Sequence, residues 1–173
     1  MSDYRFEEIY IDLDLLEEEV NELRRHLREF TQQCVVGLEA QNEACIPVKA
    51  TVGAAGYDLK ALCGMTLPVG EIVKVPTGVR LRIPPGYEAQ VRSRSGLAAR
   101  GIIVVNSPGT IDSDYRGEVC VLMQSTKRTH EIKAGDRIAQ LVFHQIPEVY
   151  FEIVEGLETD TVRGIGGFGS TGE

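Results

Sequence analysis

The sequence predicts an all-β domain behind a helical extension, and three observations carry this prediction. Apolar residues recur with a helical period between residues 13 and 34, and with a period of two after about residue 46. Proline and glycine punctuate the second region at hairpin spacing. The charge changes at the same place: residues 1–45 hold 12 acidic and 4 basic residues, whereas residues 46–173 hold 14 of each. We therefore predict a helical extension and linker over 1–45, a β domain over 46–162 and a glycine-rich arm over 163–173.

The composition of the 173 residues excludes several classes of protein. With 43% hydrophobic and 25% charged residues the chain can bury a core, and its net charge of −8 argues against binding duplex nucleic acid. The four cysteines lie far apart and have no histidine at zinc-finger spacing, so neither a zinc site nor a disulfide framework is expected. The acidic start lacks the pattern of a signal peptide, and no stretch is apolar enough to span a membrane. We expect an intracellular, cytoplasmic protein, or a nuclear one if the source is eukaryotic or viral.

The extension is predicted to be an amphipathic helix. Its apolar stripe has heptad spacing and consists of Leu13, Leu16, Val20, Leu23, Leu27, Phe30 and Cys34. Through residues 12–34 the helix could bind copies of itself or a protein partner, or it could pack on its own domain, which is the simpler and preferred alternative. Residues 37–44 (GLEAQNEA) are interpreted as a linker.

The second region is predicted to consist of many short strands. Alternation of apolar and polar residues is found at 72–75, 79–83, 87–91, 102–105, 118–124, 137–143 and 149–154. No helical periods separate these segments, which predicts a sandwich, a jelly roll or a barrel.

Two turn-bearing segments hold candidate functional residues. Arg94, Ser95 and Gly96 offer a guanidinium, a hydroxyl and close access to the main chain, a set suited to an anionic group, although a basic turn can also be a solvated surface. Farther on, Asn106 could recognise a base edge, and Asp112 could act as a general base or simply close a turn.

Three further segments remain open on their residues alone. Asp58 could orient a metal-bound water or cap a turn, and Gln140 could face a ligand or solvent. The glycine-rich arm combines Arg163 with an aromatic residue and two hydroxyls, which suits phosphate oxygens better than it suits a structureless tail.

Taken together, five segments resemble the ordered motifs of the trimeric dUTP pyrophosphatase (dUTPase) family. They read AGYDLKA, RSRSGLA, NSPGTIDSDYRGEV, GDRIAQLV and RGIGGFGSTG, and the resemblance covers about residues 46–173. It implies a distorted jelly-roll subunit and a homotrimer with three active sites at subunit interfaces. The implied reaction converts dUTP and water to dUMP and pyrophosphate with Mg²⁺ on the triphosphate, which limits uracil in DNA and supplies dUMP for dTTP synthesis.

The resemblance also implies roles for individual residues. Asp112 would be the base that activates water, and Asp58 would hold the water shell of the metal. Substrate would be bound by Arg94, Ser95, Gly96 and Gln140 at the phosphates, Asn106, Gly109, Thr110 and Ile111 at uracil, Tyr115 at the deoxyribose, and Arg163, Phe168, Gly169, Ser170 and Thr171 in the closing arm.

Two departures from the family pattern leave alternatives open. Between Ser95 and Asn106 the chain is one residue shorter than expected, near Ala99 to Gly101, and the family does not generally carry the acidic extension. A binding or regulatory protein that acts through the helix is the alternative from another class. A dCTP deaminase, which shares the fold, is the alternative enzyme.

Overall fold

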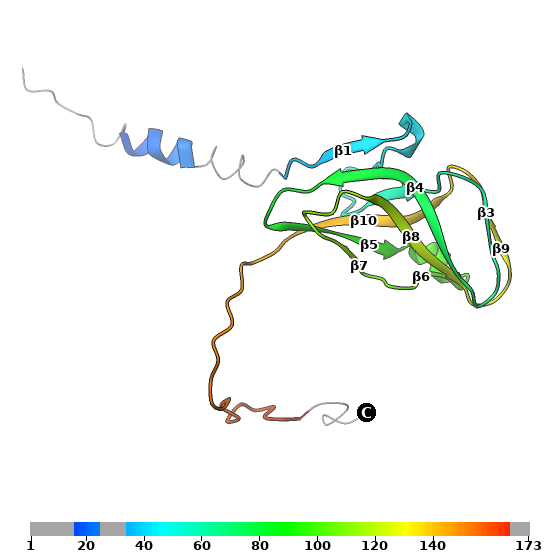
Figure 1. The fold of residues 1–173 in the computed structure, drawn as a ribbon. Helices are drawn as coiled ribbons and strands as arrows, with labels where there is room; N and C mark the ends of the chain where they lie inside the picture. The colour runs from blue at the N-terminus through cyan, green and yellow to red at the C-terminus, as the bar shows by residue number, and fades with distance from the viewer. Residues whose placement is uncertain (1–15, 25–33, 167–173) are drawn as a thin grey trace, which may run out of the picture.

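A computed structural model of the chain describes residues 16–24 and 34–166, and its body consists of antiparallel strands (Figure 1). The strands are β1 Gly37–Ala40, β2 Tyr57–Lys60, β3 Met65–Leu67, β4 Ile72–Arg82, β5 Tyr87–Ser93, β6 Ile102–Val104, β7 Gly109–Ile111, β8 Glu118–Ser125, β9 His130–Ile132 and β10 Arg137–Gln145. A 3₁₀ turn, η1 (Glu43–Cys45), and one short helix, α2 (Ser95–Ala98), complete the body. The predicted all-β jelly roll is confirmed.

The strands form two four-stranded sheets and one pair. The orders are β1-β4-β8-β6 and β2-β10-β5-β7, with β3 paired to β9. Strands distant in the sequence, such as β2 and β10, are therefore neighbours, and their register sets which side chains meet.

The core lies between the two large sheets and explains the period of two in the sequence. Along β8 every second residue is buried, and the same alternation runs through most of β4. Fully buried side chains include Leu59, Leu67, Val75, Val79, Ile83, Val121, Met123, Ile138 and Leu141. Because successive strand residues point to opposite faces, the other half of each strand is left for the outer surface.

Strand β4 bends at Gly78, where its pairing with β8 shifts between Pro76 and Arg80. Gly78 has a φ of +69°, and a Cβ there would lie 3.0 Å from Cys45 Sγ. The backbone conformation and the crowding both favour glycine, so this bend is built into the sequence.

The predicted linker is wrong, because residues 37–44 belong to the β body. Gly37 to Ala40 form β1, which pairs with β4 from Arg82 back to Val79. Gln41 N then donates to Gly78 O at 2.8 Å. The segment lacks a clear alternation of apolar and polar residues, since β1 is a short strand at the edge of its sheet. Because β1 pairs with β4, the domain begins before the predicted boundary at residue 46.

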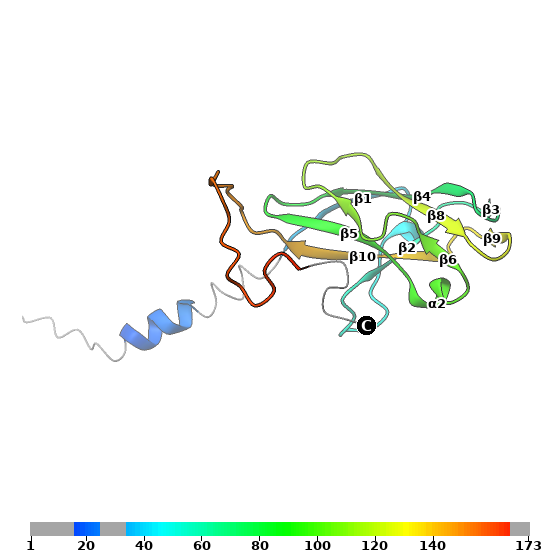
Figure 2. The ribbon, with the colours of Figure 1, turned by 90° about the horizontal axis from the view of Figure 1, so that it is seen from below.

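The helical prediction is confirmed for residues 16–24, but the preferred packing on the body is not observed there. All nine of these residues are exposed, and the helix stands clear of the sheets in two views (Figures 1 and 2). Cys34, the last residue of the predicted stripe, is not helical. Residues 13–15 and 25–33 lie outside the described residues.

The predicted strand at 149–154 is wrong: this segment has no strand partner among the described residues. After β10 the chain runs away from the body in an extended path (Figure 1). Its apolar side chains are exposed, with Phe151 at 94% and Ile153 at 99%. The alternation is real, but a strand needs a neighbouring strand to pair with.

No helix within residues 16–24 and 34–166 has both the length and the apolar character to cross a membrane.

Candidate active site

Three predicted site residues of the strands share one face of the sheet β2-β10-β5-β7, namely Asp58, Gln140 and Thr110. Gln140 lies opposite Asp58 on β2 and opposite Arg92 on β5, and Thr110 lies opposite Gln90. Directly opposed residues point to the same side of a sheet. The residues between them are buried in the core, so the predicted site lies on the outer face of this sheet.

At one end of this face, two arginines surround Asp58. The carboxylate is only 3% exposed; its Oδ1 lies 3.1 Å from Arg94 Nε and its Oδ2 lies 3.3 Å from Arg137 Nη1. Arg94 Nη1 also donates to Arg137 O at 2.9 Å. A buried carboxylate is costly without partners, and here each oxygen has a cation beside it. Asp58 thus fixes the position of the Arg94 guanidinium.

A cationic cavity of about 280 Å³ opens beside Arg94. Its lining comprises Arg94, Leu97, Arg100, Ile102, Met123, His130, Ile132, Asp136, Arg137 and Ile138. The three arginines outnumber the two carboxylates beside them, Asp136 in the lining and Asp58 behind Arg94 and Arg137, so the remaining positive charge attracts an anion.

Near the other end of the face, Asp112 is exposed at the end of β7. Its main-chain oxygen accepts a hydrogen bond from Tyr115 N at 3.2 Å, which closes a turn. Among the described residues the Asp112 carboxylate makes no hydrogen bond or ion pair, and Arg116 donates instead to the carbonyls of Ser113 and Tyr115. The main chain rather than the carboxylate holds the turn, so the carboxylate is free to accept a proton from water.

The hairpin before Asp112 is tightly packed. Gly109 is buried, and a Cβ there would lie 2.8 Å from the side-chain nitrogen of Asn106. Ser107, which precedes Pro108 through a cis peptide bond, accepts a hydrogen bond from Ser93 N at 3.2 Å. The hairpin is therefore fastened to the end of β5, which gives its polar groups a defined position.

Tyr115 is packed against the turn that follows it. It is 46% exposed, its hydroxyl donates to Glu118 O at 3.1 Å, and a Cβ added at Gly117 would collide with its ring. The absence of a side chain at Gly117 thus determines where the ring lies.

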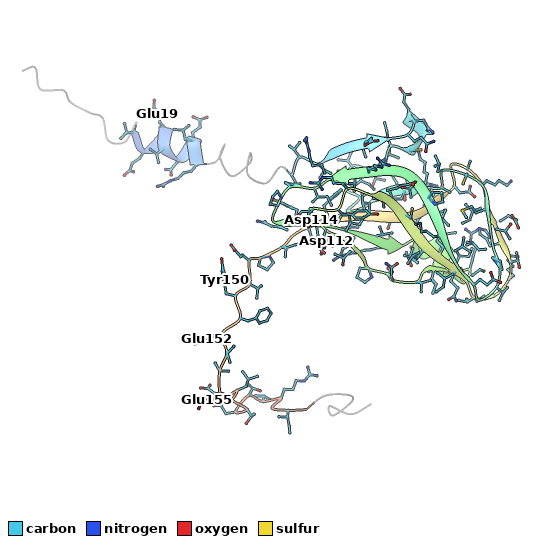
Figure 3. The ribbon with its side chains drawn as sticks, in the orientation of Figure 1. Glu19, Asp112, Asp114, Tyr150, Glu152 and Glu155 are labelled. Atoms are coloured by element: carbon cyan, nitrogen blue, oxygen red, sulfur yellow. The ribbon has the colours of Figure 1, made fainter. Side chains whose placement is uncertain are left out.

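The two groups of residues are far apart within one chain. Ile111 pairs with Ala89, and Arg94 directly follows the last residue of β5. Asp112 and Arg94 are therefore separated by about six strand residues, or roughly 20 Å. Figure 3 shows Asp112 at the end of the body from which the segment after β10 departs.

A hydrogen-bonded row that the sequence did not reveal runs along the face between them. Gln90 Nε2 donates to Glu88 Oε1 at 2.6 Å, and Arg92 Nη2 lies 2.6 Å from Gln90 Oε1 and 2.8 Å from His144 Nε2. His144 is far from Arg92 in the sequence, and the two meet only because β10 pairs with β5. Arg137 was also missed, although it stands within GDRIAQLV, three residues before Gln140.

The remaining predicted residues fall into three groups. Ser95 and Gly96 are exposed on α2, with open space in front of Gly96. In the arm, Arg163 Nε donates to Gly166 O at 2.9 Å. Phe168, Gly169, Ser170 and Thr171 lie outside the described residues.

The shortened turn near Ala99 to Gly101 is closed by hydrogen bonds. Gly101 N donates to Ala98 O, and Gly101 O accepts from Thr126 N, both at 2.8 Å. The main-chain N–H and C=O groups of Gly101 are therefore both hydrogen-bonded, although the turn is one residue shorter than expected.

An all-β body has an arginine-lined cavity at one end of a sheet face and an exposed carboxylate near the other, which defines the class as a β domain suited to an anionic ligand. Comparison with known proteins then gives the family. Residues 42–172 match the model of the dUTPase family, so the chain belongs to that family. It is 51% identical to the deoxyuridine 5'-triphosphate nucleotidohydrolase of Roseobacter denitrificans over 77% of this chain and 90% of that protein. It is 49% identical to the protein of that name from Chlamydia caviae, over 78% and 96%.

The fold is similar to that of solved phage enzymes. A variant dUTPase of Staphylococcus bacteriophage 80alpha with dUpNHpp superimposes with a TM-score of 0.72 at 24% identity, covering 80% of this chain and 99% of that one. A variant dUTPase of phage phi11 of S. aureus, described with a structural Mg(II) ion, gives a TM-score of 0.64 at 22% identity over 70% and 97%.

Proposed function

We propose that the chain hydrolyses dUTP to dUMP and pyrophosphate in a homotrimer whose active sites are shared between subunits. The observation that carries this proposal is the separation on one sheet face of the Arg94 group from the exposed Asp112. Family membership supports the substrate, and a site divided over roughly 20 Å of strand becomes whole only when another copy supplies the missing half.

In this proposal Asp112 is the general base. Its exposed carboxylate takes a proton from a water molecule, whose oxygen attacks the triphosphate as the bond between the α- and β-phosphates breaks. Among the described residues nothing else competes for this carboxylate, so both of its oxygens are available to orient the water.

The phosphates are bound by Arg94, Ser95, Gly96 and Gln140. Asp58 holds Arg94 in place before substrate arrives, and such preorganisation lowers the cost of orienting a polyanion. Gln140, directly opposite Asp58, adds a neutral donor on the same face.

The hairpin from Asn106 to Ile111 recognises uracil. The Ile111 side chain faces the core and Gly109 has none, which leaves main-chain groups for the base edge. A tight hairpin rejects the thymine methyl by its shape and cytosine by mismatched donors and acceptors. Tyr115 lies under the deoxyribose and excludes a 2′-hydroxyl.

The glycine-rich arm closes over the site. Arg163 binds phosphate through guanidinium N–H groups other than its Nε, which donates to Gly166 O. Phe168 covers the uracil ring, and Gly169, Ser170 and Thr171 complete the closure. An arm of this composition suits opening and closing with each turnover.

Mg²⁺ fits this site as an ion held mainly by the triphosphate. No cluster of three potential ligands occurs within residues 16–24 and 34–166, and Mg²⁺ bound with substrate phosphates needs few protein ligands. Asp58 Oδ1 is buried without a well-aligned hydrogen bond, which leaves it able to accept one from a water of the ion's shell. The ion would neutralise charge on the phosphates; the chain's residues position the substrate and the attacking water.

The homotrimer also accounts for the apolar segment after β10. Tyr150, Phe151, Ile153 and Leu157 are more than four-fifths exposed in the single chain. A neighbouring subunit would cover them.

The four cysteines are unpaired, which supports a reducing intracellular setting for this assembly.

A substrate panel tests the proposal. With Mg²⁺ present, pyrophosphate release is expected from dUTP far faster than from dTTP, dCTP or UTP, and excess EDTA should abolish it. A Glu71→Gln variant, which removes an exposed carboxylate distant from the site, serves as the control and should keep full activity. Ammonia release from dCTP would identify a deaminase instead. If none of the four nucleotides reacts, the regulatory alternative replaces the enzyme.

A further inference from the structure

The helix of residues 16–24 carries an exposed apolar stripe. Leu16, Val20 and Leu23 are 50%, 38% and 67% exposed, although each would gain from burial. They are spaced by four and then three residues, as in a heptad, and the sequence continues this spacing at Leu13, Leu27 and Phe30. A contiguous stripe of this kind calls for a partner surface.

We propose that the stripe packs against the same helix of two other copies, as a short parallel three-stranded coiled coil. The inference rests on the homotrimer of the proposed function, which brings three helices together. Leu13, Val20 and Leu27 occupy one core position of the heptad, while Leu16, Leu23 and Phe30 occupy the other.

One complementary charge pair across the stripe, Glu19 with Arg24, favours this occupant, whereas the preceding pair at the same positions joins Asp12 and Glu17. Glu19 flanks the stripe at the position called g, and Arg24 is at position e of the following heptad. In a parallel coiled coil these two positions meet between neighbouring helices. Residues five apart are not neighbours within one helix, so Glu19 and Arg24 can pair only between copies. Glu19 projects from the helix in Figure 3.

The connection to the β body permits such an arrangement. The chain between Phe30, the last core residue of the proposed coiled coil, and the start of β1 at Gly37 can span up to about 25 Å when extended. Three heptads are short for an independent coiled coil. Tethering within one trimer, however, raises the local concentration of the helices to about millimolar, which favours their association.

Cross-linking of the full-length protein tests the parallel contact directly. Leu16→Cys places a thiol in the proposed core, and Glu18→Cys places one on the outer side of the same helix as the matched control. Mild oxidation should give a covalent dimer for Leu16→Cys, with a yield unchanged over about hundredfold dilution. The control and the parent, which has four cysteines of its own, should give little of this product. Equal yields for the two variants would overturn the inference.

Charge reversal gives an independent readout. Glu19→Lys and Arg24→Glu should each lower the helical circular dichroism signal at 222 nm, and the double variant should recover most of it. The matched pair Glu18→Lys and Arg25→Glu lies on the outer side. Its double variant should change the signal at 222 nm by the sum of the two single changes, with no recovery. Absence of recovery for Glu19 and Arg24 would contradict the coiled coil.

Activity and mass measured on the same samples separate this inference from the proposed function. An active trimer without cross-links or recovery would disprove only the coiled coil. A monomeric protein would disprove the shared site and the coiled coil together.

Discussion

The carboxylates at the two ends of the outer sheet face have different surroundings. Asp58 is buried between Arg94 and Arg137, whereas Asp112 is exposed and, within the described residues, unpaired. The first arrangement holds the Arg94 guanidinium in position within one chain. The second leaves an acceptor free. A binding group gains from being fixed in advance, while a base has to keep its oxygens for the reacting water.

The largest expected effect comes from removing the free carboxylate. Asp112→Asn should lower kcat for dUTP by about 10²- to 10⁴-fold, because an amide cannot take the proton. KM and the mass of the assembly should change little, since the turn is held by the Asp112 main chain. Initial rates of pyrophosphate release check this, and a fully active variant would rule out Asp112 as the base.

A mixing experiment asks whether the two ends work together across subunits. Asp112→Asn and Arg94→Gln should each be nearly inactive alone. Co-refolded at equal amounts, they should recover up to about one quarter of the parent activity, since a random site has one chance in four of combining both intact halves. Mixtures that stay inactive, although trimers of both chains are present by mass spectrometry, would place the whole site in one subunit.

A smaller effect is expected from loosening the paired end. Arg137→Gln removes one of the two cations beside Asp58, and because Arg137 is 53% exposed the loss should be about 1 kcal/mol. That corresponds to a roughly fivefold higher KM for dUTP, with kcat nearly unchanged. Arg137→Lys, which keeps the charge, is the matched control and should recover part of the loss. A change confined to kcat would show that Arg137 does not act by positioning Arg94.

The smallest effect concerns the ring at the open end. Gly117→Ala adds a Cβ that collides with the Tyr115 ring and should displace it. The ratio of kcat/KM for dUTP over UTP should fall severalfold, because a pocket that rejects a hydroxyl by shape tolerates only small displacements. Tyr115→Phe is the control, since it keeps the ring and should keep the ratio. An unchanged ratio in Gly117→Ala would show that the position of the Tyr115 ring does not determine the discrimination against the 2′-hydroxyl.

Much of the fold could be predicted because its strands are half-buried. In β8 the buried residues alternate along the whole strand, and the sequence carries the same period. Strand β1 escaped prediction since it is a short edge strand, and its pairing with β4 ends next to the bend at Gly78. The segment at 149–154 failed for the opposite reason, because its alternation has no partner strand within the described chain.

The residues of the candidate site could be predicted from the sequence, but their positions relative to one another in space could not. Asp112 and Arg94 stand within recognisable segments, whereas their separation along β5 follows from the register of β5 with β7. Arg137 and His144 were missed because their partners are 79 and 52 residues away in the chain. Contacts of that range depend on the assembled sheet, which local patterns do not encode.

In the homotrimer that we propose, the apolar segment after β10 has a consequence for the lifetime of a subunit that has not yet assembled. With Phe151 and Ile153 almost fully exposed on unpaired backbone, a dissociated chain offers proteases and chaperones an extended binding stretch. Degradation of newly made chains should therefore compete with assembly. The cellular amount of the protein would then depend on how quickly subunits meet, which makes its abundance rise more than proportionally with its rate of synthesis.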